Sequence, residues 1–490
     1  MSKQTLTLAD PTLLRHQAFV AGEWVGADSG RTVAVTNPAT GETLADVPLC
    51  GTAETARAIA AADRAQREWR NVPAKARCAI LRRLNDLMLA NVDDLALIMT
   101  AEQGKPLAES KGEIAYAASF IDWFAEEGRR VYGDTIPANS DDRRIIAIKQ
   151  PVGTTAAITP WNFPTAMLTR KAGPALAAGC SMVVKPATQT PLSAFAFAVL
   201  AERAGVPKGL LSVLTGSASE IGGEMTRNPL VRKITFTGST EVGRTLMRQS
   251  ADTIKKISLE LGGNAPFIVF DDADVDAAVE GAIVSKYRNT GQTCVCANRL
   301  YVQRGVLDAF TKKLVAKVNA MKVGPGTEEG VTQGPLIDDK ALAKIEEHIA
   351  DATKKGAKVL AGGKRHARGG LFFEPTVIGD ATGEMLFAQE ETFGPLAPIF
   401  AFDTEQEAID RANDTEFGLA AYFYSRDIGR IMRVAERIES GMIGINTGLI
   451  STAEAPFGGV KQSGLGREGS KYGIDEFLEI KYLCIAGLDR

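Results

Sequence analysis

Hydrophobic and polar residues follow two different patterns along the first half of the chain. Residues 53–69 and 76–101 are rich in Ala, Leu and Arg with a helical period, so the first quarter is predicted to be largely helical. From Arg143, short β-branched runs alternate with helical runs, which predicts βαβ units around a parallel sheet. The predicted strands are 145–149, 155–159, 182–185, 211–215 and 233–237, and the predicted helices include 166–178 and 193–204.

A second alternating series begins at Pro266 and predicts a second α/β domain. Its strands are predicted at 267–270, 300–303, 420–424 and 442–446, and its helices at 274–286, 307–320 and 405–412. An apolar β-type run at 479–485 follows a helical segment at 472–477, and no later helix is left to cover it. Because an unpaired strand of this kind often pairs with another subunit, we expect it to lie between copies of the chain.

Composition and charge exclude several classes of protein. The 490 residues are enough for two or three domains, and a formal net charge of −3 leaves no basic excess for nucleic acid or an anionic membrane. The six cysteines are scattered, as in a reducing compartment. Because neither a leader-like segment nor a membrane-length apolar run is found, we expect a cytoplasmic protein. The three histidines lie far apart, which argues against a metal site.

A glycine-containing turn between a predicted strand and a predicted helix is a candidate phosphate site. In residues 238–243 (GSTEVG), backbone N–H groups and the positive end of the helix would face a phosphate. The string nearly matches a Walker A loop, but Arg244 stands where that loop requires lysine, and the three-glycine dinucleotide fingerprint is absent. From the residues alone, a plain helix-entry turn is at least as good an interpretation.

Three further residues have candidate chemistry beside an ordinary structural role. Cys294 lies in a polar, glycine-containing loop that would expose a thiolate, although a lone cysteine is more often a small core residue. Glu260 ends an apolar strand and is either a solvent-facing residue or a general base whose pKa is raised among Leu and Gly. Asn162 follows a strand and is either a turn former or a donor to an oxyanion.

Taken together, a set of motifs resembles those of the aldehyde dehydrogenase superfamily. They occur in the family order over essentially the whole chain, as PWNFP at 160–164, VKP at 184–186, FTGS at 236–239, LELGG at 259–263, GQTC at 291–294, ETFGP at 391–395 and PFGG at 456–459. The resemblance implies an α/β fold with a Rossmann-type cofactor domain (1–138 and 152–263) beside an α/β catalytic domain (264–469). It also implies a small β oligomerisation element (139–151 and 470–490) and hence a homo-oligomer, either a dimer or a tetramer.

The same resemblance implies roles for the candidate residues. Cys294 would be the nucleophile that forms a thiohemiacetal and then a thioester, with the oxyanion held by the Asn162 side chain and the Cys294 backbone N–H. Glu260 would deprotonate the water that hydrolyses the thioester. Thr188 stands where NAD-preferring relatives commonly carry Glu, so NADP is the expected cofactor and NAD is the alternative. Cofactor contacts are also implied for Trp161, Lys185, Gly238, Ser239, Glu391 and Phe393.

Longer strings, QTCVCANR at 292–299 and APFGGVKQSGLGREGSKYG at 455–473, are similar to those of bacterial succinate-semialdehyde dehydrogenases. This resemblance places Arg170, Arg288 and Ser451 around the substrate's distal carboxylate, whereas without it both arginines are interpreted as surface charges. The expected reaction is oxidation of succinate semialdehyde to succinate with NADP. The alternatives are a glutarate-semialdehyde or broader ω-carboxy-aldehyde dehydrogenase and, from another class, a catalytically silent dinucleotide-binding structural protein, against which the retained nucleophile and base speak.

Cys296 lies close to Cys294, and in some relatives of the family the corresponding pair forms a disulfide that shuts off the enzyme. The same redox switch is one interpretation of Cys296. The other is that Cys296 packs under the loop, because so short a disulfide ring requires the backbone to move first.

Overall fold

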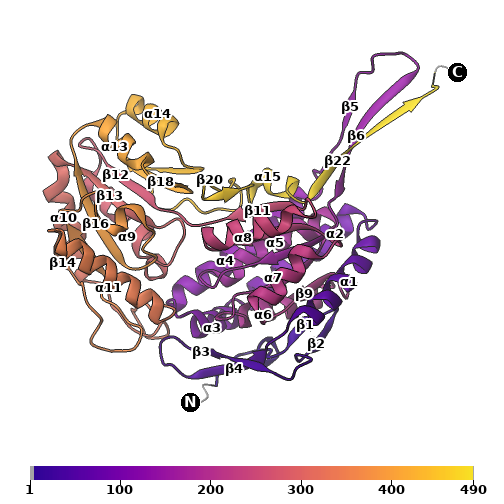
Figure 1. Cartoon of the computed structure of the whole chain (residues 1–490), viewed down its shortest axis with the longest axis horizontal. Coiled ribbons are helices and arrows are strands. Elements are labelled where there is room, and N and C mark those ends of the chain that lie inside the picture. The colour runs from indigo at the N-terminus through magenta and orange to yellow at the C-terminus, as the bar shows by residue number, and fades with distance from the viewer. Residues whose placement is uncertain (1–4, 489–490) are drawn as a thin grey trace.

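The computed structural model describes residues 5–488, in which the two alternating series form two separate sheets (Figure 1). The first sheet has eight strands and the second has seven. A three-stranded arm, built from residues 134–151 and 478–486, projects away from both sheets (Figure 1). The architecture is therefore of the predicted α/β class, with two α/β units and a smaller β element.

The first sheet is parallel in its middle and antiparallel at its edges. Its order is β2 (Glu23–Val25), β1 (Ala18–Val20), β9 (Leu211–Val213), β8 (Ser181–Lys185), β7 (Thr154–Ile158), β10 (Val231–Thr237), β11 (Lys256–Glu260) and β21 (Gly464–Leu465). The strands from β9 to β11 run parallel, as the alternating pattern predicted. They are almost wholly buried, which explains their apolar and β-branched composition.

Helices pack against this sheet in more than one layer. They are α1 (Thr52–Trp69), α2 (Ala74–Ala90), α3 (Val92–Gln103), α4 (Leu107–Glu127), α5 (Pro164–Ala178), α6 (Leu192–Ala204), α7 (Ala218–Arg227) and α8 (Thr240–Ala251). Helices α5 and α6 contact the sheet, and α2, α3 and α4 pack against them as an outer layer. The α3 and α4 helices thereby reach the residues that surround the start of α5.

The helix predicted over 76–101 is two helices in the structure. Asn91 ends α2, where its side-chain amide donates to the Leu87 carbonyl oxygen at 2.8 Å. Its backbone (φ −112°, ψ 21°) then departs from helical geometry before α3 begins. An asparagine side chain competes in this way with the helix's own hydrogen bonds, which the apolar period does not reveal.

The second sheet is parallel except at one edge, where β14 pairs antiparallel. Its order is β14 (Lys358–Ala361), β15 (Thr376–Gly379), β16 (Leu396–Phe402), β13 (Ala297–Gln303), β12 (Ala265–Val269), β18 (Ala420–Tyr424) and β19 (Met442–Ile445). Its helices are α9 (Val275–Tyr287), α10 (Arg304–Asn319), α11 (Asp339–Lys354), α12 (Leu386–Gln389), α13 (Glu405–Asn413) and α14 (Ile428–Arg437). The predicted second α/β unit is therefore present.

Short elements complete the described part of the chain. They are η1 (Pro11–Leu13), β3 (Thr32–Thr36), β4 (Thr43–Pro48), η2 (Arg288–Gly291), β17 (Phe417–Gly418), β20 (Val460–Lys461) and α15 (Ser470–Asp475). Within residues 5–488, no helix combines the length and the apolar character that crossing a membrane requires.

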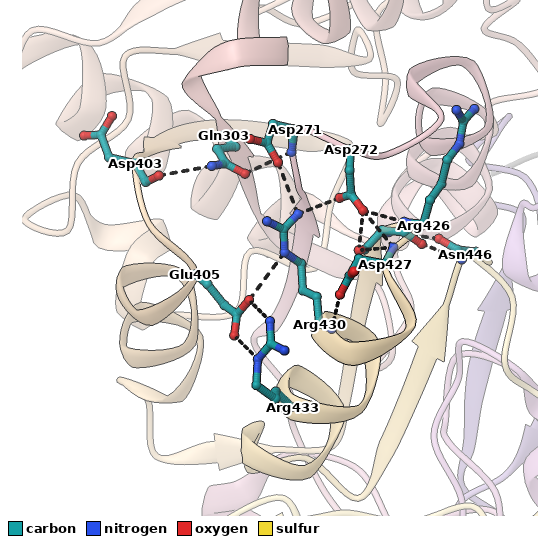
Figure 2. A network of polar contacts seen from close by, with 11 residues as sticks. Asp271, Asp272, Gln303, Asp403, Glu405, Arg426, Asp427, Arg430, Arg433 and Asn446 are labelled. Carbon is teal, nitrogen blue, oxygen red and sulfur yellow. Dashed lines mark hydrogen bonds and ion pairs between the residues drawn. The ribbon is translucent and has the colours of Figure 1, made fainter.

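At the carboxyl ends of the second sheet's strands, carboxylates and arginines form a polar network (Figure 2). Asp272, which follows β12, accepts hydrogen bonds from the backbone N–H groups of Arg426 and Asp427, each at 2.8 Å. Arg430 on α14 donates to Asp272 Oδ1 at 2.6 Å and approaches Glu405 Oε2 on α13 at 3.4 Å. The network, called the end network below, therefore fastens both helices to the end of the sheet.

One edge of the last strand pairs within the chain, and the expected pairing of this strand with another subunit stays a prediction. β22 (Leu478–Ala486) pairs along its whole length with β6 (Arg143–Pro151), and β5 (Asp134–Ile136) pairs with the other edge of β6. The sequence shows that no later helix covers β22, but it contains no local sign of a partner so far upstream. Ile480 and Tyr482 are still 75% and 63% exposed, and the outer edge of β22 has no partner strand among the described residues.

Candidate active site

The two sheets face each other across a cavity of about 220 Å³. Strand β11 of the first sheet ends at Glu260. After a short crossing, strand β12 of the second sheet begins at Ala265. Gly263 allows this crossing to pass close to the nucleophile loop, because a Cβ atom there would lie 2.6 Å from the Cys294 carbonyl oxygen. The cavity brings together the predicted residues Trp161, Asn162, Gly238, Ser239, Cys294, Glu391 and Phe393.

Cys294 is held at the cavity by a bent loop. Asn289 and Thr290 adopt left-handed backbone angles (φ 52° and 57°). Gly291 (φ 74°) follows, at a place where a Cβ atom would lie 2.1 Å from the Gly394 carbonyl oxygen. Burial raises the pKa of the partly exposed Cys294 thiol to about 12, and a nearby arginine opposes this rise only in part. Desolvation therefore disfavours the thiolate in this conformation, and the reactive role of Cys294 stays a prediction.

Asn162 lies between β7 and α5, with its side chain against the nucleophile loop. Its Nδ2 atom donates to the Gln292 carbonyl oxygen at 3.0 Å. A primary amide has two N–H donors, so the second remains for an oxyanion near Cys294. Its Oδ1 atom is buried without a hydrogen-bond partner.

Glu260 has the raised pKa that its apolar surroundings predict. The residue is 3% exposed, and burial and the neighbouring Glu468 raise its pKa well above the ordinary value, although Arg170 and Lys171 oppose the rise. Its Oε2 atom has no hydrogen-bond partner. Glu260 does not line the cavity with Cys294, and a Cβ atom on Gly458 would lie 3.0 Å from its Oε1 atom. The structure therefore places this carboxyl group behind the cavity.

The helix that follows β10 begins at the cavity, and its N-terminus is capped differently from those of α5 and α6. The first N–H groups of α5 already donate to the Glu113 carboxylate at 3.0 and 3.2 Å, and those of α6 donate to Glu102 at 2.7 and 2.8 Å. The cap of α8 is instead the uncharged hydroxyl of Ser239, which accepts from the Val242 N–H at 3.4 Å beside the cavity. An N-terminus without a carboxylate cap beside the cavity is compatible with a phosphate at residues 238–243, although Glu241 lies in its first turn, and this site stays a prediction.

Two ionisable groups predicted to contact the cofactor, Glu391 in the cavity lining and the buried Lys185 outside it, have few partners. Lys185, at the end of β8, donates to the Pro186 carbonyl oxygen at 3.2 Å, and burial lowers its pKa to about 8. Burial raises the pKa of Glu391 to about 7, and its Oε1 atom accepts from the Gly263 N–H at 3.4 Å. Spare donors on Lys185 and spare acceptors on Glu391 fit the hydroxyls and phosphates of a dinucleotide. Thr188 lies in the partly exposed turn after β8.

The two arginines of the predicted carboxylate clamp differ in their partners, and neither is a free surface charge. Arg170 is 1% exposed, forms an ion pair with Glu468, and lies 3.8 Å over the Phe457 ring. Arg288 is partly buried over the Phe163 ring at 5.1 Å. Together with Ser451 it lines a small pocket. Their interpretation as surface charges is therefore wrong, because the aromatic rings and the fold around them were not visible in local sequence.

Sequence reasoning missed Tyr116, which lies on α4. Burial raises the pKa of its hydroxyl, while Arg170, Arg288 and Ser451 are all close enough to oppose that rise. The residue lies within an apolar helical segment, so no sequence signal separated it from the core. It adds an aromatic hydroxyl to the predicted clamp.

The structure also shows the surroundings of Cys296 and which side chains could hold a metal ion. Cys296 is a buried free thiol whose Sγ donates to the Lys286 carbonyl oxygen at 3.2 Å, so a disulfide with Cys294 stays a prediction. Residues 5–488 contain no group of three His, Cys, Asp or Glu side chains that could hold a metal ion.

Comparison with known proteins identifies the class to which this site belongs. Residues 24–483 match the model of the aldehyde dehydrogenase family, and the chain belongs to that family. It is 68% identical over 483 residues to a glutarate-semialdehyde dehydrogenase of Pseudomonas aeruginosa, covering 99% of this chain and 100% of the relative. It is 64% identical over 480 residues to the NADP(+) succinate-semialdehyde dehydrogenase GabD of Escherichia coli, covering 98% and 100%.

A solved structure confirms the fold. The crystal structure of succinate-semialdehyde dehydrogenase from Burkholderia pseudomallei matches with a TM-score of 0.97 and 66% identity, covering 98% of this chain and 100% of that one. The protein is therefore an oxidoreductase with the aldehyde dehydrogenase fold, and the alternative of a silent structural protein is withdrawn.

Proposed function

We propose that the protein oxidises succinate semialdehyde to succinate with NADP. The observation that carries the proposal is an unpaired cation beside the nucleophile loop. Among the described residues, no carboxylate oxygen lies within 4.0 Å of the Arg288 guanidinium, and Arg288 shares a pocket with Thr293 and Ser451. A partly buried arginine without a carboxylate partner is suited to bind the distal carboxylate of a substrate whose aldehyde reaches Cys294.

The reaction uses Cys294 as the nucleophile. Its partly exposed thiol gives its proton to solvent water and attacks the aldehyde carbon to give a thiohemiacetal, whose oxyanion accepts hydrogen bonds from the free Asn162 N–H and the Cys294 backbone N–H. The dinucleotide, when bound, supplies the hydride acceptor that turns this adduct into a thioester. Glu260 then deprotonates the water that hydrolyses the thioester. Since Glu260 lies behind the cavity, this step requires its side chain to turn toward Cys294.

NADP is proposed over NAD because the residues expected to hold the adenosine end of the cofactor include a cation and no carboxylate. Lys185 has spare donors, and Thr188 adds a hydroxyl in the same turn. A 2′-phosphate would meet no repelling charge from either residue. The NADP(+) specificity in the name of the 64% identical relative supports this choice.

Glutarate semialdehyde is the second candidate substrate, and the 68% identical relative favours it. The two substrates differ by one methylene, and the same arginine and hydroxyl partners would suit either distal carboxylate. Tyr116 and the paired Arg170 complete the proposed carboxylate end of the site.

The test compares three aldehydes: succinate semialdehyde, glutarate semialdehyde and butanal, each with NADP and NAD, followed by absorbance of the reduced cofactor. Arg288→Ala is expected to lower kcat/KM for the preferred semialdehyde by about ten- to several-thousand-fold and to leave butanal nearly unchanged. Arg170→Ala should act in the same direction and Ser451→Ala more mildly. Butanal is the control because a folding defect would slow all three aldehydes. If the wild type oxidises butanal as efficiently as either semialdehyde, the carboxylate clamp is wrong.

The arm is proposed to join copies of the chain into a homo-oligomer. Its outer strand presents an open edge and the exposed side chains of Ile480 and Tyr482, which a second arm would cover. The cytoplasm is the proposed location, since all six cysteines are free thiols, as is typical of a reducing compartment.

A further inference from the structure

One fully buried asparagine ties the proposed oxyanion donor to the nucleophile loop. The Nδ2 atom of Asn289 donates to the Asn162 carbonyl oxygen at 3.0 Å and to the Gln292 carbonyl oxygen at 3.2 Å. Its Oδ1 atom accepts from Gln103 Nε2 at 2.9 Å, and its backbone N–H donates to Glu109 Oε2 at 2.8 Å. Every polar group of this side chain is therefore engaged, and two of its partners are the residues that hold the donor and the loop.

Asn289 makes these contacts from a left-handed backbone conformation. Its φ of 52° and ψ of 36° are tolerated by asparagine better than by most residues with a side chain. Thr290 follows with nearly the same angles, so the turn that leads to Cys294 contains two successive residues in this conformation. Such a conformation persists only where the surroundings hold it, and the bonds from Gln103 and Glu109 supply that hold.

The same Asn162 carbonyl oxygen is fixed from the opposite side. Lys105 Nζ donates to it at 2.7 Å and also pairs with Glu113 Oε2 at 2.5 Å. Glu113 in turn accepts hydrogen bonds from the first N–H groups of α5. The start of α5 is thus fastened to α4, and Asn289 is the link from this fixed point to the loop that carries the nucleophile.

We propose that Asn289 is a positioning residue for the oxidation, acting through Asn162. One Asn162 N–H is committed to the Gln292 carbonyl oxygen, so the direction of the other depends on where Gln292 lies relative to α5. Asn289 sets that relation because it binds both carbonyl oxygens at once. Oxyanion donors act only when they are held at hydrogen-bond distance from the developing charge. The inference rests on the proposed role of Asn162 as that donor.

A double-mutant cycle tests the proposal, with kcat and KM measured separately for the preferred semialdehyde. Asn162→Ala is expected to lower kcat about 100- to 1000-fold. Asn289→Ala is expected to lower kcat about 10- to 100-fold with KM changed only a few-fold, since a small misplacement of a donor is costly to the transition state. The double variant should be no slower than Asn162→Ala alone, because Asn289 has nothing left to position.

Asn264→Ala is the matched control. Asn264 is also buried and also bonds across elements, to the Ala388 carbonyl oxygen at 3.0 Å and to Asn298 at 2.7 Å, but not to Asn162. Its effect on kcat should multiply with that of Asn162→Ala. Asn289→Gly removes the same side chain while glycine accepts the left-handed turn, so it should reproduce the loss in kcat even if the Ala variant folds poorly.

The outcomes distinguish the positioning role of Asn289 from the catalytic role of Asn162. If Asn289 and Asn162 losses multiply in the double variant, or if Asn289→Gly keeps the wild-type kcat, Asn289 is not a positioning residue and the proposed catalytic role of Asn162 stands. If Asn162→Ala itself keeps the wild-type kcat, the role of Asn162 falls and the positioning role falls with it.

Discussion

The end network and the cavity lie at opposite ends of the second sheet. Both regions contain polar side chains, but those of the end network have partners and some of those near the cavity do not. In the end network the arginines pair with carboxylates: Arg433 donates to both oxygens of Glu405 at 2.9 Å, and Arg430 approaches Asp271 at 3.1 Å (Figure 2). Near the cavity, Asn162 Oδ1 in its lining and Glu260 Oε2 outside it are buried without any hydrogen-bond partner. Unpaired buried polar groups are costly, so these two atoms lower stability where the proposed reaction takes place.

The carboxyl pKa values differ between the two regions in the same way. The hydrogen bonds from Arg433 lower the pKa of Glu405, so this carboxylate stays ionised at neutral pH. Burial raises the pKa of Glu260 well above its ordinary value and that of Glu391 to about 7. Solvation and pairing, and not residue type, therefore decide which glutamates hold helices together and which can exchange a proton near neutral pH.

The largest effect is expected from a substitution that stops the proposed reaction at the cavity and leaves the end network unchanged. Cys294→Ala removes the group that we propose bonds covalently to the aldehyde, so turnover should fall by about 10⁴-fold or more. Cofactor binding and the melting temperature should stay near the wild-type values, because the thiol is small and partly exposed. Absorbance of the reduced cofactor, fluorescence titration with NADP and thermal melting measure the three quantities. Residual turnover above about one hundredth of wild type would remove Cys294 as nucleophile.

The next effect separates the two halves of the reaction. Glu260→Gln should allow the first oxidation and then stall at the thioester, giving a burst of reduced cofactor near one equivalent per site, with steady turnover lowered about 100-fold or more. Stopped-flow absorbance records the burst. In the wild type the hydrolysis step should speed up as pH rises, because a raised pKa keeps Glu260 protonated at lower pH. A variant that turns over at the full steady rate would take Glu260 out of the mechanism.

The sequence predicted what depends on local pattern and missed what depends on distant contacts. β18 has its predicted bounds, Ala420–Tyr424, because a buried strand is a continuous apolar run between turns. The raised pKa of Glu260 followed from its apolar neighbours. The pairing of β22 with β6 and the bond from Gln103 to Asn289 join residues far apart in the chain and leave no periodic trace. The catalytic and cofactor roles themselves came from family motifs and not from periodicity.

A smaller effect is expected when a carboxylate is added near Lys185. The proposed cofactor site would then contain charges of both signs, as the end network does. Thr188→Glu places a negative charge in the turn that begins at Lys185, where it would repel a 2′-phosphate and could pair with the lysine. We expect the ratio of kcat/KM for NADP to that for NAD to fall by about tenfold or more. Thr188→Gln is the control, since it has nearly the same size without the charge. An unchanged ratio in the Glu variant would refute the proposed basis of cofactor choice.

The smallest expected effect is a change in stability with no change in activity. It tests the contrast between the end network and the cavity. Arg430 is about one-fifth exposed, binds Asp272 and Glu405, and lies 4.8 Å over the Phe270 ring. Arg430→Ala should lower the free energy of unfolding by about 1 to 2 kcal/mol at neutral pH, which shifts the melting temperature by a few degrees, and leave kcat unchanged. Its carboxylate partners have lowered pKa values, so their stabilisation is present above their unfolded pKa and is lost as pH falls through the folded pKa.

Glu260→Gln should change stability in the opposite direction. The folded pKa of Glu260 is raised, so ionising it costs stability as pH rises from the unfolded value of 4.5 toward the folded one. The amide removes that cost, and the variant should melt at a higher temperature than wild type at about pH 8, with the difference vanishing below about pH 4.5. Melting curves across pH for both variants and wild type decide the matter. If both variants lose stability equally at about pH 8, the cavity carboxyl is not held at a cost, and the contrast between the two regions fails.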